Sequence, residues 1–300
     1  MISVDLNELD GKTAHAHLLG AVGPRPIALA STIDNDGNPN LSPFSYFNVF
    51  SSNPPTLIFS PARRVRDNTT KHTLHNAEAT REVVINVVNY DIVQQTSLAS
   101  TEYADGVNEF TKAGLTPIES DVVKPFRVKE SPAQFECKVK DIVALGDGGG
   151  AGNLIICEVV RMHINENILD ENGIINMQKI DLVARMGGNY YCRASGEALF
   201  EVEKPLAKLG IGVDQIPKRI RQSTYLDGND LGKLGNVESL PNDAELAEFA
   251  ENWKIKEIFE KSANGLEMHE NLHQYAKELL DEDKVSKAWK ALLCDKLNRI

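Results

Sequence analysis

The sequence predicts a mainly β protein, a barrel or a sandwich, that continues into a helical C-terminal extension. In the first two thirds, short apolar runs rich in β-branched and aromatic residues alternate with turn signals. These runs follow at short spacing and are not the alternating βαβ units of a parallel sheet. After about Ser195 the apolar residues take helical spacing and charges become frequent. We therefore expect two domains, residues 1–195 and 196–300.

Each expected strand is an apolar run bounded by turn residues. The runs are Pro26–Thr32, Leu41–Phe50, Thr56–Ser60, Val83–Val88, Gln134–Leu145 and Leu154–Ile164. Short helices are expected at Lys71–Ala79, Asp91–Ala99 and Val107–Ala113. The glycine-rich stretch Gly146–Gly152 joins the last two strands into a long hairpin. Because a strand and not a helix follows it, this stretch is not expected to bind a dinucleotide.

The extension contains two helices with apolar stripes. The first begins at Asn242 and Glu245, an N-x-x-E start signal, and the second lies near the C-terminus. The stripes are Leu246, Phe249, Ala250 and Trp253, and then Val285, Ala288, Trp289, Leu292 and Leu293. The stretch Gly210–Leu240, rich in Gly, Asp and Asn, is predicted to be an extended arm. The stripes must bury against the barrel or a partner subunit.

Charge and composition exclude several classes of protein. The net charge of −11 argues against a nucleic-acid partner. No apolar run reaches the ~20 residues of a membrane helix, and the N-terminus lacks a signal-peptide pattern. The four cysteines contain no C-x-x-C pair, which argues against a zinc ribbon or a disulfide framework. We expect a cytoplasmic protein with no membrane partner.

The stretch Leu41–Ser60 is the first candidate for a binding site. Ser42, Ser45, Tyr46 and Asn48 interleave with its aromatic residues. Flat apolar groups with short hydrogen-bonding groups between them suit a flat ligand with polar edges. An amphipathic strand with one wet face would have the same pattern.

A cationic and hydroxyl-rich stretch follows the end of the second run. It contains Ser60, Arg63, Arg64, Lys71, Thr73 and Asn76. Arginine forks and hydroxyl donors suit a phosphate monoester, and a helix N-terminus would add to the site. An exposed basic loop is the alternative, but the adjacent Leu41–Ser60 stretch favours a phosphate site.

Two further motifs are candidates for a binding or metal site. Arg185, Gly187 and Gly188, followed by two tyrosines, could cover a ring system, or they could be a loop end packed on the barrel. His269–His273 fits the H-E-x-x-H zinc-protease signature. A catalytic zinc needs a third protein ligand, and the sequence offers none at a suitable position. We therefore expect a polar helix flank there and no metal site.

Taken together and in order, these segments resemble the flavin reductase-like family of FMN-binding split β-barrels, which includes flavoredoxin-type proteins. The matching segments are Gly23–Ser31, Asn40–Asn48, Ser52–Ser60, Lys71–Asn76, Val83–Asn86, Glu158–Val160 and Val183–Gly188. The resemblance covers roughly residues 20–193. It implies a Greek-key split barrel, a homodimer and FMN bound near the subunit interface.

The resemblance also implies roles for individual residues. The residues along the isoalloxazine and the ribityl chain would be Ser42, Pro43, Phe44, Ser45 and Tyr46, with Thr32 close by. The phosphate would be held by Ser60, Arg63, Arg64, Lys71, Thr73 and Asn76, and Arg185 would lie near the open flavin face. His72 departs from the family's K-D-T motif, in which Asp is frequent. Nothing carries over to the extension.

The implied function is that of an FMN-dependent oxidoreductase of flavin reductase type. Hydride would pass from NAD(P)H to the flavin and on to a small-molecule or protein acceptor. The cofactor carries this chemistry, so no side chain is assigned a catalytic role. The alternative is a flavoredoxin-like electron carrier that binds FMN but is reduced by a protein partner.

Overall fold

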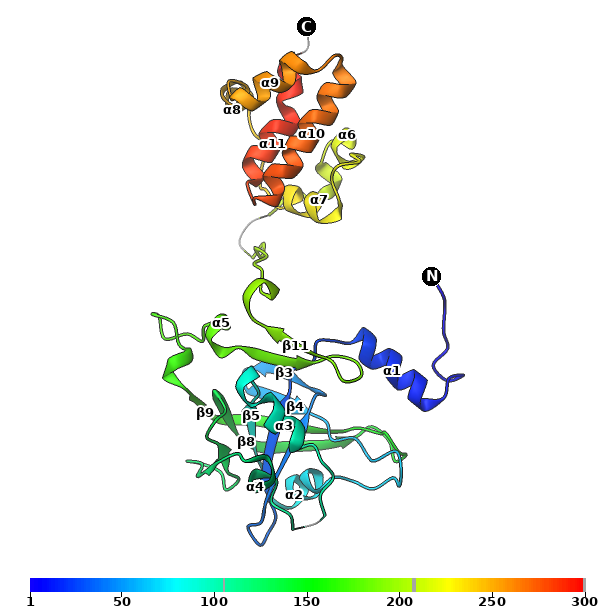
Figure 1. The fold of residues 1–300 in the computed structure, drawn as a ribbon, viewed down its shortest axis with the longest axis vertical. Helices are drawn as coiled ribbons and strands as arrows, with labels where there is room; N and C mark the ends of the chain where they lie inside the picture. The colour runs from blue at the N-terminus through cyan, green and yellow to red at the C-terminus, as the bar shows by residue number, and fades with distance from the viewer. Residues whose placement is uncertain (105, 207–208, 299–300) are drawn as a thin grey trace. The chain divides into compact units, whose positions relative to one another are not determined.

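The computed structural model describes residues 1–104, 106–206 and 209–298. The chain divides into two compact units, Met1–Phe200 and Glu201–Ile300 (Figure 1). The first unit holds every strand described in the chain, and the second is helical.

The first unit is built on one antiparallel seven-stranded sheet with the order β2-β1-β5-β8-β9-β4-β3. Its strands are β1 (Ala28–Ile33), β2 (Pro39–Phe44), β3 (Phe47–Ser52), β4 (Pro55–Phe59), β5 (Glu82–Val87), β8 (Ala133–Ala144) and β9 (Asn153–Ile164). Two-stranded sheets are formed by β6 (Pro117–Ile118) with β7 (Arg127–Val128), and by β10 (Leu182–Arg185) with β11 (Tyr191–Ala194). The mainly β class with C-terminal helices is confirmed.

The predicted strand Leu41–Phe50 is in fact two strands, and this prediction was wrong. The chain bends at Ser45 and Tyr46, so that β2 pairs with β1 whereas β3 pairs with β4. β2 and β3 are the two edges of the sheet order, and only these two residues join them. The edges must therefore lie close together, which curls the sheet into a barrel.

The sheet buries side chains on both faces because successive residues of a strand point in opposite directions. One face, with Ala28, Ala30 and Phe59, packs against α2 (His72–Thr80). The opposite face, with Leu29 and Leu41, packs against α3 (Val93–Leu98) and α4 (Glu109–Ala113). This explains why β1 is buried along its whole length.

The short helices lie close to where they were predicted. The predicted helix Asp91–Ala99 is η1 (Tyr90–Ile92) followed by α3, and the other two are α2 and α4. The remaining short elements of this unit are η2 (Glu166–Ile168), α5 (Met177–Ile180) and η3 (Gly196–Ala198). The stretch Gly146–Gly152 is the hairpin connection between β8 and β9, as expected.

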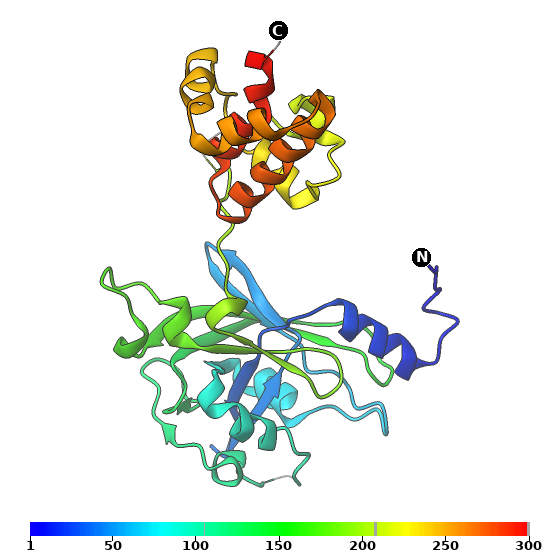
Figure 2. The ribbon, with the colours of Figure 1, turned by 45° about the horizontal axis from the view of Figure 1, so that its top comes forward.

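Helix α1 (Gly11–Ala21) was not predicted, and none of its side chains is buried. Figures 1 and 2 show it projecting from the barrel. The buried Arg25 guanidinium donates to the carbonyl oxygens of Leu19 (2.9 Å) and Val22 at the end of this helix, and to that of Met186 (2.9 Å). A cation is favourable at a helix C-terminus. Arg25 thus ties α1 to the loop after β10.

The second unit packs short helices around α10 and α11 (Figure 2). Its elements are η4 (Val213–Gln215), α6 (Lys218–Arg221), α7 (Gly228–Gly235), α8 (Asp243–Ala250), α9 (Trp253–Lys261), α10 (Gly265–Asp281), α11 (Val285–Leu293) and η5 (Cys294–Asn298). Leu246 of the first stripe and Trp289 of the second belong to one buried cluster. The expected burial of these stripes against the barrel or a partner subunit is therefore not needed, because Leu246 and Trp289 are buried within their own unit.

The extended arm predicted at Gly210–Leu240 was also wrong. Ile216, Ile220 and Leu234 are fully buried in the helical cluster. Asp227 and Asp230 form a capping box that starts α7. The Asp, Asn and Gly residues thus cap and connect short helices, which a composition argument does not distinguish from an extended chain.

Within the described residues, no helix combines the length and the apolar character needed to cross a membrane.

Candidate functional site

A polar cavity lies beside the N-terminus of α2. Its lining residues are Asn40, Ser42, Arg64, Lys71, His72, Thr73, Ala99, Ser100, Thr101, Glu102, Tyr103 and Glu109. Four residues predicted to bind the cofactor, Ser42, Arg64, Lys71 and Thr73, are therefore brought together. They come from β2, the loop after β4 and the start of α2.

Lys71 is the N-cap residue of α2, and its side chain is partly buried. Its ammonium group has no hydrogen-bond or ion-pair partner among the residues that the structure describes. Burial lowers the pKa of Lys71, an effect opposed by Glu102 and reinforced by Arg64. A partly desolvated cation beside a helix N-terminus favours the binding of an anion.

The two neighbouring arginines have different surroundings. The Arg64 guanidinium donates to Glu102 (Nε to Oε1, 3.1 Å) and to the Thr70 carbonyl oxygen (2.6 Å) inside the cavity wall. Arg63 donates through Nε and Nη2 to the Asn68 side chain and carbonyl oxygen, both at 2.7 Å. Arg63 therefore stabilises its own loop, and it does not line the cavity.

A network of amides and hydroxyls joins β1, β2 and α2. The Asn40 amide donates to Thr73 Oγ1 (2.9 Å) and Thr32 Oγ1 (3.3 Å), and the Asn76 amide donates to Thr32 Oγ1 (3.1 Å). Thr32 and Thr73 are fully buried. The network fixes the start of α2 on the sheet. Asn40 was not predicted as a site residue, although it begins one of the matching segments.

The predicted flavin-ring residues of β2 and the following corner are not all in the cavity. Phe44 is buried in the barrel core, where its ring centroid lies 5.4 Å from that of Phe59. Pro43 and Ser45 are partly exposed. Tyr46 lies at the corner, and burial raises the pKa of its phenol. Only Ser42 of this stretch lines the cavity.

Ser60 is buried just after β4, and its hydroxyl has no partner among the described residues. A Cβ placed on Gly152 would lie 2.6 Å from Ser60 Oγ, so glycine is required there for the serine to keep its position. An unsatisfied buried hydroxyl costs about 1–3 kcal/mol. A ligand or a water molecule that hydrogen-bonds to Ser60 would remove this cost.

Two carboxylates in the cavity wall were not predicted. Glu109 at the start of α4 is buried, accepts the Leu41 N–H (3.1 Å), and has a pKa raised by burial. Glu102 binds the cavity arginine, as described above. Both reach the cavity only because residues 99–103 and Glu109 lie beside Asn40 and Ser42 of β2. No local sequence signal indicates that packing.

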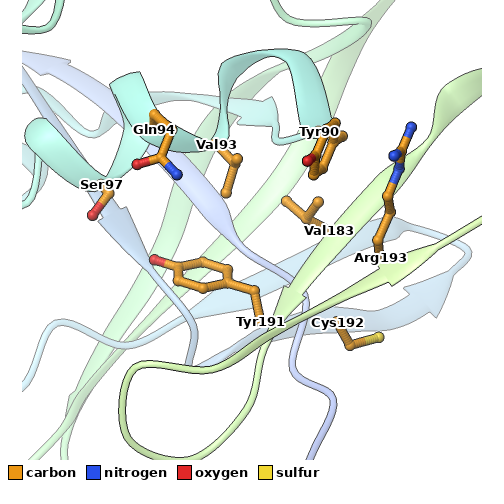
Figure 3. Close-up of a pocket in the computed structure, with 8 residues that line it drawn as sticks. All are labelled: Tyr90, Val93, Gln94, Ser97, Val183, Tyr191, Cys192 and Arg193. Carbon is orange, nitrogen blue, oxygen red and sulfur yellow. The ribbon is translucent and has the colours of Figure 1, made fainter.

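A second cavity, of about 200 Å³, lies between α3 and β11 (Figure 3). Its lining residues are Tyr90, Val93, Gln94, Ser97, Val183, Tyr191, Cys192 and Arg193. Guanidinium groups lie over two tyrosine rings of this wall. The Arg193 guanidinium is 3.8 Å from the Tyr90 ring centroid, and the Arg185 guanidinium is 4.7 Å from the Tyr191 ring centroid. Arg185 thus borders this cavity and lines neither of the two.

The H-E-x-x-H histidines lie on α10 and bind other side chains. His273 is buried with its Nδ1 2.9 Å from Ser223 Oγ, whereas His269 Nε2 lies 3.2 Å from Asp295. Asp295 also accepts from Arg219 at 2.6 Å. The two histidines therefore contact different side chains. The Asp295 carboxylate beside His269 is already paired with the Arg219 guanidinium.

Asp121, Glu136 and His163 are close enough together to hold a cation. The buried Glu136 carboxylate, however, already accepts from the backbone N–H groups of Asp121, Val122 and Val123, and it contacts His163 Nε2 at 2.6 Å. Asp121 pairs with Arg161 at 3.1 Å. The cluster therefore has a structural role: its contacts fix the segment that precedes β7.

Comparisons with known proteins concern the N-terminal two thirds of the chain. Residues 21–183 match the flavin reductase like domain. An uncharacterized protein of Aquifex aeolicus is 41% identical over 197 residues, which cover 66% of this chain and 98% of that protein. The structure of nitrilotriacetate monooxygenase component B from Bacillus cereus has a TM-score of 0.63 and 31% identity, covering 67% of this chain and 98% of that one.

A protein of Shewanella frigidimarina assigned as a flavin reductase with a split-barrel domain has a TM-score of 0.57 and 29% identity. The match covers 66% of this chain and 96% of that one. All three relatives are thus matched over nearly their whole length by about two thirds of this chain.

Proposed function

Because the chain belongs to the flavin reductase-like family, we propose that its first unit binds FMN and transfers hydride from NAD(P)H to the flavin. An acceptor, either a small molecule or a partner protein, would then take the electrons. FMN supplies the redox chemistry when bound, and the protein holds and orients it.

The ammonium of Lys71, which has no hydrogen-bond or ion-pair partner among the described residues, is the observation that carries this proposal. A phosphate monoester would provide the missing countercharge and would accept from the N-terminal amides of α2. Arg64, Ser42 and Thr73 surround the same cavity with a guanidinium and two hydroxyls. These are the donor types that FMN's phosphate requires.

The remaining roles follow from this assignment. The flavin ring would extend along β2 toward Ser45 and Tyr46, and the unsatisfied Ser60 hydroxyl would donate to the bound cofactor. Arg185 would lie near the open face of the ring. Arg63, Asn76 and Thr32 would act by fixing the loop and α2. Phe44 would support the site from the core.

We also propose a homodimer. Val49 and Phe50 of the edge strand β3 are each 64% exposed, and a second subunit would cover them. Size-exclusion chromatography with light scattering should give a mass of two chains. A monomer at micromolar concentration would contradict this part of the proposal.

The function is tested on the purified full-length protein. Denaturation should release FMN, identified by chromatography, and anaerobic addition of NADH or NADPH to the holoprotein should bleach its visible band. A protein that neither carries nor binds FMN would refute the proposal. If FMN binds but neither nucleotide reduces it, the flavoredoxin-like carrier reduced by a protein partner becomes the better account.

A further inference from the structure

The Glu102 carboxylate pairs with two arginine side chains at the edge of the polar cavity. Its Oε1 lies 3.1 Å from Arg64 Nε and its Oε2 lies 3.1 Å from Arg66 Nη2. One carboxylate therefore bridges two guanidinium groups, as a phosphate group would do. Glu102 is also the cavity-lining residue whose charge most directly opposes an anionic ligand, since it pairs with the cavity arginine.

A phosphate cannot bind the same two arginine donors while the Glu102 carboxylate stays in place. A phosphate monoester brings three terminal oxygens, each a strong acceptor. The Glu102 side chain must therefore move, and it belongs to the part of the cavity wall formed by residues 99–103.

We propose that Glu102 is an internal competitor of the ligand phosphate and so limits the affinity of this site for phosphate-bearing ligands. Its carboxylate must leave Arg64 and Arg66 before a phosphate binds them. A ligand with a phosphate replaces the contacts that Glu102 gives up and also pairs with Lys71. Riboflavin, which lacks the phosphate, replaces none of them. This inference rests on the proposed FMN site and adds a determinant of affinity to it.

If Glu102 competes with the phosphate, changing it should have the opposite effect on FMN affinity to changing a residue that binds FMN. Removing the charge of Glu102 should strengthen FMN binding, because the arginines become free. If Glu102 instead served to orient Arg64 toward the phosphate, the same change would weaken binding. Glu102 is partly exposed, its side chain being 42% accessible, so Glu102→Gln keeps the shape and should not disturb folding.

The test uses full-length protein from which bound flavin has been removed. Dissociation constants for FMN, riboflavin and inorganic phosphate are measured by flavin fluorescence and calorimetry for the wild type and Glu102→Gln. We expect FMN and inorganic phosphate to bind about threefold to tenfold more tightly to the variant, a range set by the strength of partly exposed ion pairs. Riboflavin affinity should stay the same.

The matched control is Glu119→Gln, which changes the net charge equally. Glu119 is exposed, and its carbonyl oxygen, not its carboxylate, accepts from Arg127. This control should bind FMN as the wild type does. Equal or weaker FMN binding by Glu102→Gln, or equal tightening in the control, would overturn the competition. Failure of every variant to bind FMN would overturn the flavin assignment, and tighter phosphate binding alone would then still support the competition.

Discussion

At the scale of single residues, the cavity combines opposing charges that the sequence shows only in part. Lys71, Arg64 and Thr73 could be predicted because cations and hydroxyls follow a strand end within a few residues. Glu102 and Glu109 could not, since they lie far along the chain and reach the cavity only through folding. The sequence does not show that Arg64 lines the cavity whereas Arg63 does not. That difference depends on the loop conformation, in which Arg63 binds Asn68 instead.

Lys71→Met should lower FMN affinity about tenfold to a hundredfold, because charge-assisted hydrogen bonds contribute about 1.5–3 kcal/mol. The melting temperature of Lys71→Met should hold or rise, because the native ammonium is partly desolvated and has no hydrogen-bond partner in the part of the chain that the structure describes. Flavin titration and thermal unfolding of the flavin-free protein measure the two effects. Lys140→Met, at an exposed lysine paired with Glu158, is the control. Unchanged FMN binding by Lys71→Met would exclude Lys71 from the phosphate site.

At the scale of elements, apolar runs predicted the strands well and the connections poorly. β5, β8 and β9 lie within one residue of their predicted bounds, because buried runs of β-branched residues have few alternatives. The β2–β3 corner was missed because Ser45 and Tyr46 continue the pattern of polar residues interleaved with aromatic ones on either side of them. Trp253 was placed in the first stripe, but α8 ends at Ala250, and Trp253 is 71% exposed at the start of α9.

Helix α10 contains a buried titratable group, His273. Burial first, and then Arg219 and His269, lower its pKa to about 4 against the opposing effect of Asp295. The unfolded chain, with a pKa near 6.5, binds a proton that the folded chain rejects. Stability of the C-terminal unit should therefore fall as the pH drops from about 6.5 toward 4.

Between pH 7 and pH 5 we expect the free energy of unfolding to fall by about 2 kcal/mol from this group. Both tryptophans of the chain, Trp253 and Trp289, lie in the C-terminal unit, so urea unfolding followed by tryptophan fluorescence reports on it. His273→Gln should lose most of this pH dependence, whereas His17→Gln, exposed on α1, should keep it. Equal pH dependence in both variants would show that His273 is not the group responsible.

At the scale of the whole molecule, each unit has its own core. The barrel unit contains two buried clusters and the helical unit a third, and none of the three shares residues between the units. The apolar stripes of the extension therefore need neither the barrel nor a partner subunit for burial. The matched relatives, which correspond in length to the first unit, agree with this division.

Residues 1–200 and 201–300, produced separately, should each fold and unfold cooperatively. The first fragment should bind FMN within about twofold of the full-length affinity, since the cavity residues all lie in it. The second should show the circular dichroism of a helical protein. A first fragment that stays folded but loses FMN would mean that the helical unit contributes to the site.

The contact between Arg25 and Met186 has a consequence for synthesis on the ribosome. The two residues are 161 positions apart, so α1 is synthesised well before the Met186 carbonyl group that anchors it. At roughly 5–20 residues per second, the delay is about 10–30 s. During that interval the guanidinium stays in water, because burying it without partners is costly. Helix α1 thus leaves the ribosome before Met186 but is among the last parts of the barrel unit to be fixed.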